Sequence, residues 1–204
     1  MCHFQCWMRF PAEEEVSSGN PLLARLSKLL KSGESSDFVI QSPSGMELKA
    51  GRVAVVHSYH LRLFSPVFVA MLDSDREEAK TGRLLIEDSS DAAIQALVKF
   101  LYSGVVTEDC LTNVEELVRL FVLADKYQIM ELRQICQVEL SKRLSDEILF
   151  SLVELVHLHD DLTELGDGAK QYCMRHAKRL HESGLLEPIV AKYARFACDA
   201  MCSQ

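Results

Sequence analysis

The sequence predicts an α+β fold in which a short β-sheet flanked by helices is followed by an all-helical C-terminal extension. The segments with strand character lie between residues 36 and 87, whereas the segments from residue 91 onward repeat their apolar residues with the helical period. The 204 residues include only 9 glycines and 5 prolines, so few positions interrupt a helix. Strands followed by a run of helices are typical of an α+β core with a helical appendage.

The first ordered element is expected to be a helix that begins near Pro21. Residues 1–20 are rich in Glu, Ser, Gly and Asn toward their end, which predicts a flexible lead. Proline is suited to the first helical turn, and Leu22, Leu26 and Leu29 then follow at i, i+4 and i+7. This spacing predicts a helix with one narrow apolar stripe.

The strand signals are short and are separated by turn residues. We expect strands at 36–40, 46–56 and 83–87, with the first two joined as a hairpin through the turn at 42–45. A short helix is expected at 57–63, and Ser65 with Pro66 predicts the N-cap and first residue of another. The charged segment 73–82, which ends in Gly82, is expected to be a loop.

The C-terminal half is predicted to be a series of helices with identifiable start signals. Thr112 and Glu115 have capping-box spacing, as do Asp161 and Glu164, and Ser145 is placed to cap the helix between them. Pro188 is expected to open the last helix, which runs to about Met201.

Charge, apolar run length and cysteine content argue against a nucleic-acid-binding, membrane-spanning or secreted protein. The formal net charge is −8 and the basic residues are scattered, which argues against a nucleic-acid surface. No apolar run is long enough for a membrane span or a secretory leader. The seven cysteines are odd in number and irregularly spaced, which favours reduced thiols in an intracellular protein of the cytoplasm, the nucleus or both.

No pattern of catalytic or metal-binding residues stands out from the sequence. His157 and His159 are two residues apart and point to different sides of a helix, so they cannot readily share one ion. Cys173 and His176 lack a second ligand pair at zinc-finger spacing. There is no nucleophile elbow and no phosphate-binding loop. We therefore expect no enzymatic activity, no metal and no cofactor.

One spaced pattern does resemble a known family. The residues at 57–72 resemble the signature of BTB/POZ domains, in which a strand leads through a histidine into a pair of helices. The pattern is carried by His57, Leu61, Ser65, Pro66, Val67, Phe68, Met71 and Leu72. The resemblance covers residues 21–143 and implies a BTB/POZ fold there.

The remaining residues, 144–204, resemble the short helical extension (a 3-box or partial BACK segment) of the MATH-BTB group, which includes speckle-type POZ protein. The 20 residues before the first helix are too few to form a MATH domain. We therefore expect a flexible lead at 1–20, a BTB/POZ domain at 21–143 and a BACK-like extension at 144–204.

The resemblance implies a homodimer in which the first helix and the helix near His57 bury apolar surface. By position, Leu22, Leu26, Leu29 and His60 match that dimer interface. His60 stands where relatives carry an aliphatic residue, and a charged imidazole is costly in a buried contact. We therefore expect dimerisation to weaken as pH falls through the histidine range.

The resemblance also implies binding to cullin-3, as the substrate adaptor of a ubiquitin ligase. The matching residues are Met71, Leu72, Arg76, Glu78 and Tyr127. Glu78 matches the Glu of the family's hydrophobic-x-Glu motif, but Arg76 takes its hydrophobic position. Two alternatives remain: a module that pairs with other BTB proteins or regulatory partners without cullin, and a channel tetramerisation domain, which the helical extension argues against.

Overall fold

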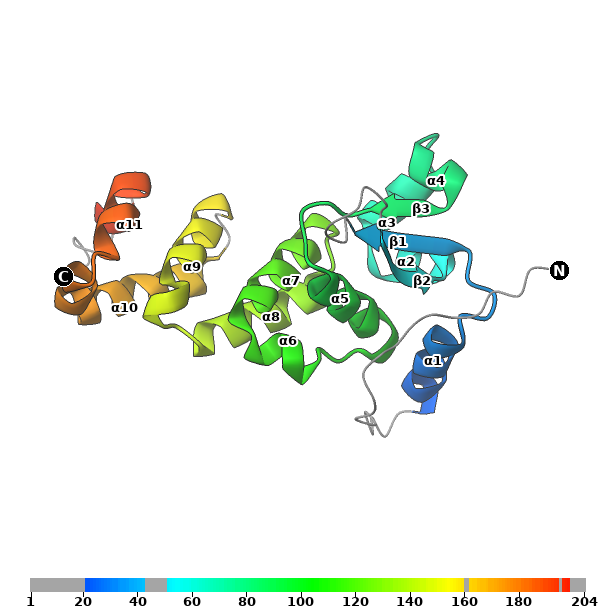
Figure 1. Ribbon diagram of the computed structural model, residues 1–204, viewed down its shortest axis with the longest axis horizontal. Coiled ribbons are helices and arrows are strands. Elements are labelled where there is room, and N and C mark those ends of the chain that lie inside the picture. The colour runs from blue at the N-terminus through cyan, green and yellow to red at the C-terminus, as the bar shows by residue number, and fades with distance from the viewer. Residues whose placement is uncertain (1–20, 43–50, 160–161, 195, 199–204) are drawn as a thin grey trace. The chain divides into compact units, whose positions relative to one another are not determined.

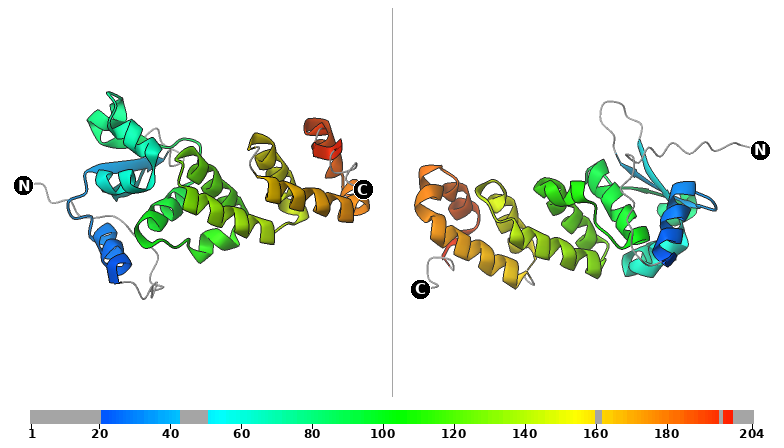
Figure 2. Two further views of the ribbon diagram at one scale, coloured as in Figure 1. Left: turned by 180° about the vertical axis from the view of Figure 1, so that it is seen from behind. Right: turned by 90° about the horizontal axis from the view of Figure 1, so that it is seen from below.

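The computed structural model describes residues 21–42, 51–159, 162–194 and 196–198, which are drawn in colour in Figure 1. The chain divides into two compact units, Met1–Arg133 and Gln134–Gln204. The first contains a three-stranded sheet with helices, and the described part of the second is helical (Figures 1 and 2). The predicted α+β fold with a helical extension is confirmed.

The sheet of the first unit consists of β1 (Phe38–Ser42), β2 (Gly51–Val56) and β3 (Arg83–Leu85) in the order β2-β1-β3. β1 pairs antiparallel with β2, which confirms the hairpin pairing, although residues 43–50 lie outside the described part. β3 pairs with β1 in parallel. Phe38, Ile40 and Ser42 alternate inward along β1, as expected for a strand with one buried face.

The central helix of this unit is α5 (Asp91–Ser103), which contacts β2, α1 (Pro21–Ser32) and α2 (Ser58–Phe64) as well as two later helices. Its start is fixed by Ser90, whose hydroxyl accepts a hydrogen bond from the backbone N–H of Ala93 at 3.1 Å. Nine of its residues are buried, and this apolar helix organises the core: Ala93, Ile94, Ala96, Leu97, Val98, Phe100, Leu101, Tyr102 and Ser103.

Two short helices connect α2 to β3. α3 (Pro66–Leu72) begins as predicted, because the Ser65 hydroxyl accepts a hydrogen bond from the N–H of Phe68 at 3.0 Å. The expectation of a loop at 73–82 is wrong in part, since α4 (Glu77–Thr81) forms there and ends at Gly82. A helix of five residues is too short to show an apolar period, and none of its residues is buried.

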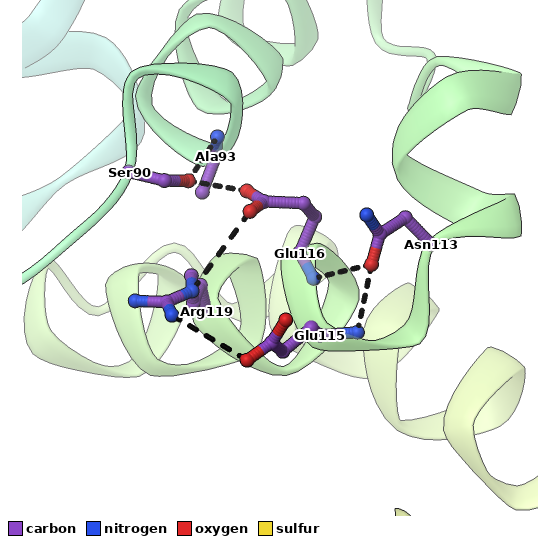
Figure 3. Close-up of polar contacts among 6 residues, drawn as sticks. All are labelled: Ser90, Ala93, Asn113, Glu115, Glu116 and Arg119. Carbon is purple, nitrogen blue, oxygen red and sulfur yellow. Dashed lines mark hydrogen bonds and ion pairs between the residues drawn. The ribbon is translucent and has the colours of Figure 1, made fainter.

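The start of α7 (Val114–Lys126) corrects the predicted capping box. Thr112 ends a short helix, α6 (Glu108–Thr112), and Asn113 is the N-cap instead. The Asn113 side-chain oxygen accepts from the N–H groups of Glu115 and Glu116 at 3.1 and 3.3 Å (Figure 3). Thr112 donates to the carbonyl of Asp109, so its hydroxyl is already engaged in the preceding helix.

The second unit is built from α9 (Asp146–Leu158), α10 (Thr163–Glu182) and α11 (Leu186–Lys192), and α8 (Met130–Lys142) crosses the boundary between the units. Ser145 is the N-cap residue of α9 but makes no side-chain capping bond, and Asp161 lies outside the described residues. α11 begins two residues before Pro188, which sits in the first turn, where a missing N–H costs no helical hydrogen bond. The buried cluster of this unit comprises Leu149, Val153, Ala169, Cys173, Leu180, Ile189, Tyr193 and Phe196.

Candidate partner-binding surfaces

The leucine stripe of α1 is only partly buried within its own chain. Leu30 is buried on the side of the helix that packs against α5, whereas Leu26 and Leu29 are half-buried. The side chain of Leu22 is outside the described part of the structure. Two of the three predicted leucines therefore keep apolar surface that a partner could cover, and their role in a dimer stays a prediction.

The outer face of α2 carries two exposed apolar side chains that the sequence analysis missed. Tyr59 is 71% exposed and Leu63 is 59% exposed, although both are large. They are four residues apart and so share one face of the helix, opposite the buried His60 and Leu61. The sequence signal for this pair is one i, i+4 spacing, and a helix of seven residues is too short for that spacing to mark an apolar face. Aromatic and aliphatic side chains exposed together are typical of an interaction surface.

His60 points into the core of its own chain. Its side chain is on the inner side of α2 and the residue is 5% exposed. The ring Nε2 lies 2.6 Å from the carbonyl oxygen of Leu101, and the ring stacks on Tyr102 with centroids 4.1 Å apart. Burial lowers the pKa of His60 because water no longer solvates the charged ring, although the bond to Leu101 acts in the opposite direction. The ring offers little surface to a partner, and its place at a dimer interface stays a prediction.

The start of α2 is held by Tyr102 of α5 and by two residues between α1 and β1, Glu34 and Asp37. The hydroxyl oxygen of Tyr102 accepts from the backbone N–H of His57 at 2.9 Å and lies 2.7 Å from its ring Nδ1. The other ring nitrogen of His57 is 2.9 Å from the carbonyl oxygen of Glu34. Asp37 accepts hydrogen bonds from both the N–H and the hydroxyl of Ser58, at 2.7 and 2.5 Å. These contacts fix the helix that presents Tyr59 and Leu63.

A second surface surrounds α3 and α4, where the residues predicted to bind cullin lie. Met71 and Tyr127 are 8% and 4% exposed, so they form the base of this surface more than its face. Tyr127 stacks almost flat on Phe68, with ring centroids 4.6 Å apart and planes inclined by 9°. Its backbone carbonyl accepts a hydrogen bond from the Ser65 hydroxyl at 2.5 Å. The C-terminal end of α7 is thereby attached to the start of α3.

The outer part of this second surface is polar. Leu72 and Glu78 are half-buried, and Arg76 is exposed at the N-cap position of α4, without a side-chain capping bond. Burial raises the pKa of the Tyr127 hydroxyl well above its usual range, and the negative charges of Asp88 and Glu78 add to this effect. The five residues predicted for cullin thus lie on elements that meet in unit 1, but their roles stay predictions.

The buried cysteines of the described residues include Cys110 and Cys173. Burial raises the pKa of the Cys110 and Cys173 thiols to about 11, which disfavours the reactive thiolate. Within the described ranges no three His, Cys, Asp or Glu side chains are grouped so that they could hold a metal ion. Among the described helices none is both long enough and apolar enough to cross a membrane.

Comparison with known proteins gives a consistent set of similarities. The family model "BTB/POZ domain" matches residues 26–144. The chain is 34% identical over 120 residues to BTB and MATH domain-containing protein 40 of Caenorhabditis elegans, covering 58% of this chain and 29% of that protein. It is 32% identical over 140 residues to a BTB/POZ domain-containing protein of Arabidopsis thaliana, covering 67% of this chain and 56% of the relative.

Among solved structures, the BTB domain of zebrafish PATZ1 matches 64% of this chain and 98% of its own length, with a TM-score of 0.47 and 14% identity. The chain spans less than two thirds of the length of the curated relatives given above. The family match ends at residue 144, whereas the compact units divide after Arg133. The predicted division between 143 and 144 stays a prediction.

Proposed function

Because this chain belongs to the BTB/POZ domain family, we propose that it is a dimeric protein-interaction scaffold that serves as substrate adaptor or regulator of a cullin-3 ubiquitin ligase. A BTB domain is a protein-interaction module, so the function lies in surfaces and not in a reaction centre. The proposal assigns no catalytic step to the chain itself, which would position other proteins for ubiquitin transfer.

The observation that supports a dimer is the apolar surface that α1 and α2 leave exposed to solvent. Tyr59 and Leu63 are exposed, and Leu26 and Leu29 are only half-buried, in a single chain. Both helices contact α5, so each is supported from behind by the core. A two-fold symmetric contact uses the same patch on both subunits. Each apolar side chain of the patch is therefore buried in both copies of the chain.

The dimer is tested with two substitutions that place a carboxylate on this surface, Leu26→Asp and Leu63→Asp. Each should convert the dimer to monomer in sedimentation, because two unpaired charges would be buried at a symmetric contact. Leu63 is exposed, so its replacement leaves the chain's own core intact. Lys28→Asp, at an exposed position of α1, is the control and should stay dimeric. A wild-type chain that sediments as a monomer would contradict the proposal.

A second candidate function is a BTB module that pairs with other BTB proteins or regulatory partners and does not engage cullin. One observation favours it. Arg76 occupies the position at which the family motif requires an apolar residue, and its side chain is exposed at the start of α4. A guanidinium cannot be buried in an apolar pocket without a partner for its charge. Capture by the cullin N-terminal region separates the two functions.

A further inference from the structure

The ring of His60 is enclosed on several sides by residues of α5 and α2. Tyr102 covers one face at 4.1 Å with planes inclined by 28°, and Phe64 lies against the ring at 5.2 Å. Nε2 is 2.6 Å from the Leu101 carbonyl oxygen, which is only an acceptor, so this nitrogen carries the proton in the neutral ring. The neutral imidazole therefore fits the site with one hydrogen bond and two aromatic contacts.

In the described part of the chain, no carboxylate is placed to accept a hydrogen bond from the second ring nitrogen of a protonated His60. From α5 the titratable group that faces it is Tyr102, and burial raises the pKa of that hydroxyl to about 12, so it stays neutral. On the side of α2, the charge of a protonated His57 would repel a second imidazolium. α3, which packs against α2, contains no charged residue, and Asp37 ahead of β1 is hydrogen-bonded to Ser58.

Because His60 is one of the two buried residues of α2, its protonation would weaken the packing of this helix. α2 has seven residues, and His60 and Leu61 are its buried ones. We propose that His60 is an acid-sensitive latch, in which the neutral ring holds α2 against α5 and uptake of a proton from water releases the helix. Release would displace Tyr59 and Leu63, which are carried on the outer face of the same two turns.

The direction of the pH effect follows from burial. Burial holds the pKa of His60 in the folded chain below the ordinary 6.5 of a histidine. The unfolded chain therefore binds the proton first as pH falls, and the ring's contribution to stability is complete above about pH 6.5. That contribution is lost progressively as pH falls from there through the lower pKa of the folded state. Acidification should loosen α2.

The test compares the full chain with His60→Gln and His60→Leu at about pH 7.5 and about pH 5.5, on either side of the ordinary histidine range. Glutamine keeps an N–H for the Leu101 carbonyl, and leucine keeps the apolar volume, but neither titrates. The measurements are the urea midpoint and the hydrogen-exchange protection factors of the α2 amides. His181→Gln is the matched control, because His181 is an exposed histidine in the second unit.

In the wild type and in His181→Gln, the urea midpoint and α2 protection should both fall on acidification. Both His60 variants should lose most of that fall. An acid response in the His60 variants equal to that of the wild type would overturn the proposal. If neither variant folds, the wild type decides by NMR, because a His60 ring that titrates without any change in α2 protection would also overturn it.

The effect on α2 does not depend on self-association. Urea and hydrogen-exchange readouts test the latch in a monomer or in a dimer. Only the further consequence, a dimer that weakens in acid, rests on the proposed function. Sedimentation of the same samples separates the two: a chain that is monomeric at both pH values contradicts the dimer, while the latch is still judged from the exchange data.

Discussion

At the scale of single residues, Gly82 is the position where the backbone most clearly restricts the side chain. Its φ is +64°, and a Cβ atom there would lie 2.9 Å from the carbonyl oxygen of Asp37. Its own carbonyl accepts the N–H of Val39 at 2.8 Å, so the turn cannot move away without loosening β1. Gly82→Ala should lower the free energy of unfolding by about 1–3 kcal/mol, or more because of the close contact.

Urea denaturation measures this cost, and Gly33→Ala provides the matched control. Gly33 has nearly the same φ, +60°, but a Cβ there would meet its nearest neighbour at an ordinary 3.9 Å. Gly33→Ala therefore carries the backbone strain alone, whereas Gly82→Ala adds a clash with backbone. Equal losses in the two variants would show that the contact with Asp37 has no energetic effect.

At this scale the sequence indicated which residues have an unusual type or spacing, but it did not indicate which way their side chains point. Leu26 and Leu29 were recognised from their spacing, and the structure leaves both half-exposed on α1. His60 was recognised as unusual, but its burial against Tyr102 depends on α5, about 40 residues away in the chain. Tyr59 and Leu63 were missed because a seven-residue helix is too short for its exposed face to be distinguished by period.

At the scale of elements, Asn113 decides where α7 begins. Its side-chain oxygen binds two N–H groups of the first turn, and Figure 3 shows Glu115 and Glu116 of that turn facing Arg119, with ion pairs of 3.7 and 3.8 Å. Asn113→Ala should lower the free energy of unfolding by about 0.5–2 kcal/mol, the usual cost of losing an N-cap. Thermal or urea unfolding of the full chain measures it.

Thr112→Ala is the informative comparison for that cap. The sequence pattern assigned the cap to Thr112, but in the structure this residue ends α6 and its exposed hydroxyl donates to a carbonyl of the same helix. Its replacement should have a smaller effect than that of Asn113. The reverse order would restore the capping box predicted from the sequence.

The length of an element and the distance to its partner decide whether a sequence pattern can predict it. Long amphipathic helices such as α5 and α7 show several turns of apolar period, and the Ser65 and Ser90 caps bond locally. α4 and α6 have five residues each and too little periodicity to be distinguished from loops. The parallel pairing of β3 with β1 joins residues more than 40 apart, and no local pattern encodes such a partner.

At the scale of the whole molecule, two surfaces are built by different parts of one core. α5 supports α1 and α2, whose apolar side chains are proposed to face a second copy. Phe68 of α3 stacks on Tyr127 at the end of α7, in the region of the proposed cullin contact. Sequence and family resemblance predicted both regions, and the effect of the exposed Arg76 on binding at the second stays a prediction.

Arg76→Leu tests that dependence directly. If the chain docks a cullin scaffold through α3 and α4, a leucine at the motif's hydrophobic position should strengthen capture of the purified cullin N-terminal region. Full burial of such a side chain contributes about 1.5–3 kcal/mol, which corresponds to roughly tenfold or more in Kd. Lys80→Leu, at an exposed position of α4, removes the same charge outside the motif and should leave capture unchanged. Failure of both the wild type and Arg76→Leu to capture cullin, in a chain that still dimerises, would favour the pairing module that works without cullin.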